Sequence, residues 1–95
     1  MNWLNKIPKK KNDLAWRIID GEAVVIPLDN QPVDGESLDI FNATATRIWE
    51  FIDGNNSVSD IIKKIVNEYG IEYEKAEAQI KDFLGSLSKK RLMDV

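Results

Sequence analysis

The chain has 95 residues, a length that predicts a single domain, and 43% of them are hydrophobic, enough for one compact core. Its 13 basic and 16 acidic side chains give a net charge of −3, which favours solubility and argues against nucleic acid as the main partner. Cysteine and histidine are both absent. Their absence excludes disulfides, thiolate metal sites and every Ser-His or Cys-His nucleophilic arrangement, so we expect no metal and no other cofactor.

Residues 1–13 have the composition of a polar, mobile N-terminal arm. A short apolar patch around Leu4 precedes Lys9-Lys10-Lys11, whereas a signal peptide has its charge first and a longer apolar run after it. No segment reaches the roughly 20 apolar residues that span a bilayer. We therefore expect one domain over residues 14–95, a cytoplasmic protein and no membrane partner.

A β-hairpin is predicted over residues 14–28. Asp20-Gly21 lies between two apolar runs, and this dipeptide favours a two-residue turn because glycine tolerates positive φ. The turn places four apolar residues on one face, pairing Ile18 with Ala23 and Trp16 with Val25. We expect this face to pack on the core.

A short third strand is predicted over residues 36–40, after a loop rich in turn residues. Polar and apolar side chains alternate there, so Leu38 and Ile40 are expected to point inward. A short strand that follows a loop is suited to the edge of a sheet.

Three helices follow. The first begins after Asn42, whose side chain can cap it, and ends before Gly54. Ser57 and Asp60 resemble a capping box at the start of the second helix, which Gly70 ends. The third runs over residues 73–90. Apolar residues recur at helical spacing on one face of each helix: Ala45, Ile48, Trp49 and Ile52 in the first, Val58, Ile61, Ile62, Ile65, Val66 and Tyr69 in the second, and Ala76, Ile80, Phe83, Leu84 and Leu87 in the third.

Strands followed by helices indicate an α+β fold: a three-stranded sheet followed by three helices, with a winged helix-turn-helix-like arrangement. Carboxylate pairs such as Asp53 and Asp60 have no neighbouring base or glycine-rich loop, so no enzyme activity is expected. A winged helix can read nucleic acid, but acidic Glu74, Glu77 and Asp82 interrupt the third helix and would weaken attraction to phosphates.

The segment Asn42-Ala-Thr-Ala-Thr-Arg-Ile-Trp-Glu-Phe-Ile-Asp-Gly54, then Ser57 to Ile61, then Asp82-Phe83-Leu84 with Leu87, resembles the PqqD family. This family comprises pyrroloquinoline-quinone synthesis protein D and related recognition elements for ribosomally made precursor peptides, and the resemblance covers about residues 14–95. Members involved in quinone (PQQ) biosynthesis tend to carry Leu-Cys before the Asp-Gly pair. Phe51-Ile52 stand there in this chain, which places it among the broader relatives.

The resemblance implies a stand-alone peptide chaperone. It would bind the leader of a precursor peptide as a strand added beside the third strand and present it to a modifying enzyme, such as a radical S-adenosylmethionine (SAM) protein. The implied strand edge is Ser37, Leu38, Asp39 and Ile40. Two flanks of the third helix could form the other wall of the site: Gln79, Phe83, Ser86 and Lys90, which we prefer, or Glu77, Leu84, Ser88 and Arg91.

Two other functions stay open at this stage. One is a winged-helix nucleic-acid-binding domain, for which Lys9–Lys11 could act as a basic arm. The other is an adaptor or oligomerisation domain that pairs through the same strand edge. For the preferred function we expect a leader peptide and a modifying enzyme as partners, no nucleic acid, and a monomer or weak dimer.

Overall fold

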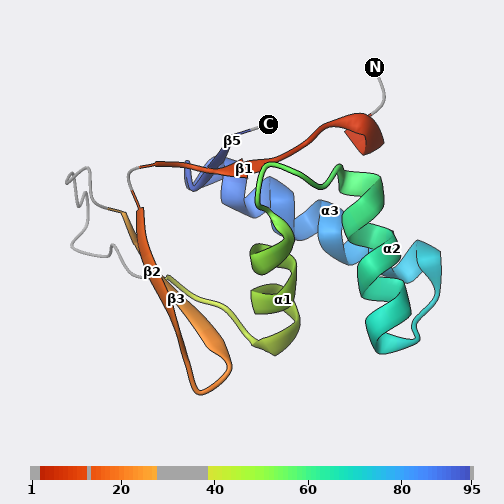
Figure 1. Ribbon diagram of the computed structural model, residues 1–95, viewed down its shortest axis with the longest axis horizontal. Helices are drawn as coiled ribbons and strands as arrows, with labels where there is room; N and C mark the ends of the chain where they lie inside the picture. The colour runs from red at the N-terminus through yellow and green to blue at the C-terminus, as the bar shows by residue number, and fades with distance from the viewer. Residues whose placement is uncertain (1–2, 13, 28–38, 95) are drawn as a thin grey trace.

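The computed structural model describes residues 3–12, 14–27 and 39–94. A three-stranded antiparallel sheet stands beside three helices (Figure 1), and the predicted α+β class is confirmed. The main elements are β2 (Leu14–Ile19), β3 (Glu22–Pro27), β4 (Asp39–Ile40), α1 (Ala43–Phe51), α2 (Val58–Tyr69) and α3 (Tyr73–Lys89). The chain ends add η1 (Trp3–Asn5), β1 (Lys9–Lys10) and β5 (Met93–Asp94).

The hairpin forms in the predicted register. Trp16 lies opposite Val25, and Ile18 lies opposite Ala23. Both turn residues have positive φ, 53° at Asp20 and 82° at Gly21, as a type I′ turn requires. The strand order is β2-β3-β4, so β2 and β4 are the two edges of this sheet.

The register of β4 corrects the expected direction of Ile40. Ile40 lies opposite Val24, on the face of the sheet that points away from the core, and the residue is 59% exposed. Asp39 instead lies opposite Val25, which is fully buried. Because side chains alternate along a strand, pairing Ile40 with Val24 turns Ile40 outward and Asp39 inward. Ser37 and Leu38 lie outside the described residues.

Capping determines where the first two helices begin, as predicted. Asn42 Oδ1 accepts from the Ala45 N–H at 2.9 Å at the start of α1. Ser57 and Asp60 form a reciprocal capping box on α2, and Gly70 ends α2 in the left-handed conformation. No helix in the described ranges is long and apolar enough to cross a membrane.

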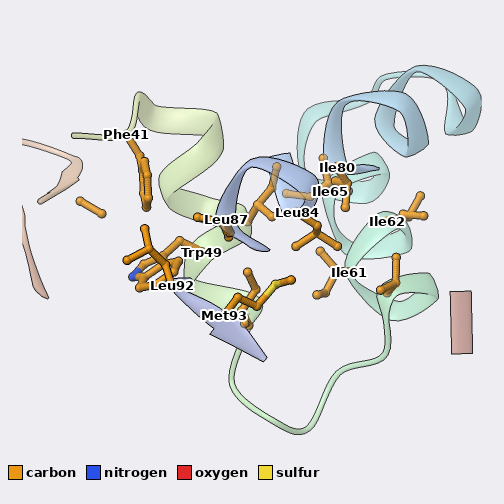
Figure 2. Close-up of a cluster of buried hydrophobic side chains, with 14 of the residues drawn as sticks. Phe41, Trp49, Ile61, Ile62, Ile65, Ile80, Leu84, Leu87, Leu92 and Met93 are labelled. Carbon is orange, nitrogen blue, oxygen red and sulfur yellow. The ribbon is translucent and has the colours of Figure 1, made fainter. Parts of the chain in front are cut away.

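The core lies between the helices and extends to the sheet (Figure 2). Isoleucines of α2 pack on α3 at one end, and Phe41, Trp49 and Leu92 gather at the other. The apolar face of the hairpin, which was expected to pack on the core, is buried only on β3. Trp16 and Ile18 of β2 stay 39% and 41% exposed.

The N-terminal segment is packed on the domain, contrary to the expected mobile arm. Pro8 is fully buried, and Trp3 and Leu4 pack against the core. The carbonyl of Lys6 accepts the otherwise unpaired N–H of Val58 at the start of α2, at 2.9 Å. Strand β1 pairs antiparallel with β5, so residues 3–12 belong to the folded unit.

Lys10 ties this segment to α1 and to the hairpin. Its Nζ donates to the carbonyl oxygen of Ile52 at 2.8 Å, just after α1 ends. The same atom lies 4.9 Å from the ring centre of Trp16 and 5.1 Å from that of Trp49. Burial lowers the pKa of Lys10, while the carboxylates of Asp53 and Glu50 oppose that shift.

Candidate functional site

Strand β4 runs along one flank of α3. At one end, Lys90 Nζ donates to Asp39 Oδ1 at 2.7 Å and joins the last turn of α3 to the strand. At the other, the rings of Phe41 and Phe83 meet edge to face with centres 5.0 Å apart. These two contacts place the Phe83 and Lys90 flank of α3 beside β4.

An open pocket of about 450 Å³ continues this line beyond the end of β4. Its apolar lining comes from Ala45, Ile48 and Phe83, where α1 and α3 approach each other. Asn42, Thr44, Gln79 and Asp82 complete the lining with polar groups. A hollow lined by both apolar and polar groups suits one or two side chains of a ligand.

The backbone of Ile40 faces the free side of β4. The Phe41 N–H donates to the Ala23 carbonyl at 2.9 Å, so Phe41 faces β3. Hydrogen-bonding direction alternates along a strand, so Ile40 presents its N–H and C=O to the opposite side. No other strand of the described chain pairs there. Strand β4 can therefore accept an additional strand.

Thr46 holds β4 in place. Its buried hydroxyl accepts from the Ala23 N–H at 2.7 Å and donates to the Phe41 carbonyl at 3.2 Å. In this way it bridges a backbone group of β3 and the carbonyl of Phe41, which follows β4 where the chain turns into α1. A threonine on the inner face of a predicted helix carries no sequence signal for this role, so Thr46 was not among the predicted site residues.

The predicted site residues fall into three groups. Asp39 and Ile40 lie on β4, while Gln79, Phe83 and Ser86 lie on the flank of α3 that faces it. Phe83 is half-buried, and Gln79 and Ser86 are exposed. Ser37 and Leu38 are not among the described residues. The pocket residues of α1, Thr44, Ala45 and Ile48, were not predicted as site residues.

An ion pair between α1 and α2 lies outside this site. Arg47 Nε donates to Glu68 at 2.7 Å, and hydrogen bonds to Glu68 and Glu50 raise the pKa of Arg47. The same contact lowers the pKa of Glu68.

Across the described ranges, no group of three or more His, Cys, Asp or Glu residues could hold a metal. The site offers backbone hydrogen bonds, an apolar wall and a pocket.

Comparison with known proteins agrees with this architecture. The chain aligns with the solved structure of TbiB1 in complex with the TbiA(beta) leader peptide at a TM-score of 0.78 and 24% identity, covering 90% of this chain and 94% of that one. It also aligns with lasso peptide synthetase B1 complexed with the leader peptide, at a TM-score of 0.77 and 18% identity over 94% and 99% of the two chains.

No curated protein matches the sequence significantly. The family model described as coenzyme PQQ synthesis protein D (PqqD) matches residues 33–93, which include β4, the three helices and the strand edge beside α3. The resemblance found in the sequence is thereby confirmed, and the chain belongs to the PqqD family.

Proposed function

We propose that this chain binds the leader segment of a ribosomally made precursor peptide as a strand added along β4. The observation that carries the proposal is the outward-facing backbone of Ile40 beside the flank of α3 that bears Phe83. Backbone hydrogen bonds would supply affinity with little demand on peptide sequence, and the pocket between α1 and α3 would select particular side chains.

Family membership and the two similar structures, both of leader-peptide complexes, support this role. The chain would act in the cytoplasm as a non-catalytic chaperone that presents the leader to a modifying enzyme. A radical SAM protein is the class of enzyme that we propose. Ser37 and Leu38 would extend the strand edge, and Gln79, Phe83 and Ser86 would line the helical wall.

A proline at position 40 tests the strand addition directly. In Ile40→Pro the N–H that faces the incoming strand is lost, while the Phe41 to Ala23 bond of the β3–β4 ladder is kept. The residue before a proline must be extended, as Asp39 already is within β4. We expect leader affinity to fall by about tenfold or more in a fluorescence-anisotropy titration.

Ile40→Val is the matched control, because it keeps the N–H and an apolar side chain. It should bind within about twofold of the parent chain. The probe is a leader peptide encoded next to this gene, and NMR amide shifts should concentrate on β4 and on the Gln79–Ser86 flank. Equal binding by Ile40→Pro, or shifts confined to other elements, would contradict strand addition. Titration with a DNA duplex should show no comparable binding.

A further inference from the structure

Strand β2 forms the second edge of the main sheet and carries little of the usual protection against pairing. Within the described chain it pairs only with β3. Every residue from Ala15 to Ile19 is exposed, and Figure 1 shows the hairpin standing to one side of the helices. Its six residues include no proline and no lysine, and Arg17 is its single charge. Such an edge is a template for another strand.

We propose that β2 pairs antiparallel with β2 of a second copy of this chain, so that the two three-stranded sheets become one continuous sheet. The backbone determines which residues face the partner. The two-residue turn makes Ile19 and Glu22 a hydrogen-bonded pair, so Arg17 also bonds toward β3. Leu14, Trp16 and Ile18 therefore present their N–H and C=O groups to the free side.

A two-fold axis through Trp16 makes these outward groups complementary. Trp16 then faces Trp16 of the second copy, and Leu14 faces Ile18 in both directions. Each of these pairs can exchange two N–H···O bonds. A register shifted to centre on Arg17 would form fewer such pairs and would place two guanidinium groups opposite each other, which is unfavourable. The edge is thus self-complementary in one register.

The side chains favour the same register. Trp16 is 39% exposed and Ile18 is 41% exposed, so both residues have surface left to bury. Aromatic pairs directly across two strands are stabilising. On the other face Ala15 would lie opposite Arg17, without a like-charge contact. One pair of strands is a small interface, in the class below about 1,200 Å² of total buried area, so the dimer should be transient.

Pairing through β2 leaves β4 free in both copies. The β4 edges would lie at the two far ends of the joined sheet, because the strand order is β2-β3-β4. A dimer could then hold a leader peptide at each end. The proposal does not depend on leader binding, and each can fail without the other.

Introduced cysteines test both the pairing and its register, because the chain has no cysteine of its own. Ala15 and Arg17 are exposed, so Ala15→Cys and Arg17→Cys should leave the fold intact. In the proposed register Ala15 and Arg17 of opposite copies form a non-hydrogen-bonded pair with Cα atoms about 4.5 Å apart, within disulfide range. Identical positions would be about 8 Å apart, which is beyond it.

With diamide as the oxidant, the mixture of the two variants should give a disulfide-linked dimer, and each variant alone should give much less. Cross-linking of Arg17→Cys with itself in preference to the mixture would overturn the register. Absence of cross-links in all three samples would overturn the pairing. The β2 edge would then either bind a strand of a different protein or stay exposed to solvent.

Sedimentation equilibrium of the full chain gives an independent measure, from about 10 µM to about 1 mM. The average mass should rise toward twice that of the monomer. Ile18→Pro removes an outward-facing N–H of β2 and should keep the chain monomeric at every concentration while leaving leader binding intact. Ile40→Pro should still dimerise but should lose leader binding. A parent chain that is strictly monomeric up to 1 mM would overturn the proposal.

Discussion

Thr46 shows how one side chain positions the candidate site. Its hydroxyl stands between the Ala23 N–H and the Phe41 carbonyl, two backbone groups that would otherwise complete the ladder between β3 and β4. Both groups belong to buried residues, so neither has water as a ready substitute. The hydroxyl therefore supports the exposed edge at Ile40 from the inside of the molecule.

Thr46→Val should destabilise the chain by about 1–3 kcal/mol, because an isosteric side chain leaves a buried donor and a buried acceptor unpaired. Urea unfolding followed by tryptophan fluorescence measures this loss. Thr46→Ser is the matched control: it keeps the hydroxyl and should lose less than about 1 kcal/mol. Equal stability of the valine and serine variants would show that the hydroxyl bridge contributes little.

At the scale of an element, helix α2 depends on its capping box. Ser57 Oγ accepts from the Asp60 N–H at 3.1 Å, and Asp60 Oδ2 accepts from the Ser57 N–H at 3.0 Å. The backbone hydrogen bond from Ser57 lowers the pKa of the Asp60 carboxyl, because the bond favours the charged form. The start of α2 is therefore sensitive to acid.

Asp60→Asn should remove this pH dependence. A carboxyl with a lowered folded-state pKa contributes its stability fully above its unfolded pKa of about 3.9, and that contribution is lost as the pH falls through the folded pKa. Between about pH 5 and pH 2, the free energy of unfolding should fall more steeply in the parent chain than in the variant. Urea unfolding at a series of pH values measures this. Parallel curves would contradict the assignment.

Ser57→Ala should cost about 1 kcal/mol at neutral pH, the usual effect of losing an N-cap side chain. Ser59 lies two residues further on, inside the helix, and takes no part in the capping box that Ser57 and Asp60 form. Ser59→Ala is therefore the control and should be close to neutral, since alanine is a better helix former than serine. Thermal unfolding followed by circular dichroism measures both variants.

At the scale of the whole molecule, the two ends of the chain close the fold together. Strand β1 near the N-terminus pairs with β5 near the C-terminus, with Lys10 opposite Met93. Leu92 is buried, and its carbonyl accepts from the Lys11 N–H at 3.2 Å. The N-terminal segment thus pairs with the segment that follows α3, which contributes Leu92 to the core.

Deletion of residues 1–11 should lower the stability by about 3 kcal/mol, because it exposes the core surface that Trp3, Leu4 and Pro8 cover. For a domain of this size the melting temperature should fall by more than about 10 °C in calorimetry. Ile7→Ser is the control, since Ile7 is already 47% exposed. An unchanged melting temperature on deletion would restore the original expectation of a mobile arm.

Local features were the ones that could be predicted. The Asp20-Gly21 turn, the Asn42 cap and the Ser57–Asp60 capping box each depend on residues within four positions of one another, and all three form as expected. Helix faces were also predictable, because a period of 3.6 residues shows which side chains share a face. The class of fold followed from these elements in their order. The family followed from the resemblance carried by residues 42–54, 57–61 and 82–87.

The sequence by itself determined the turns, caps, helix faces and family of this protein. Only the tertiary structure decided that Ile40 points outward, that Asp39 meets Lys90, and that residues 3–12 pack on the core. Each of these depends on contacts between distant segments, where a shift of one residue in strand register reverses every side chain. The Gln79–Phe83 flank of α3 was one of two that the helical period left equivalent, and packing of Phe83 against Phe41 placed it beside β4.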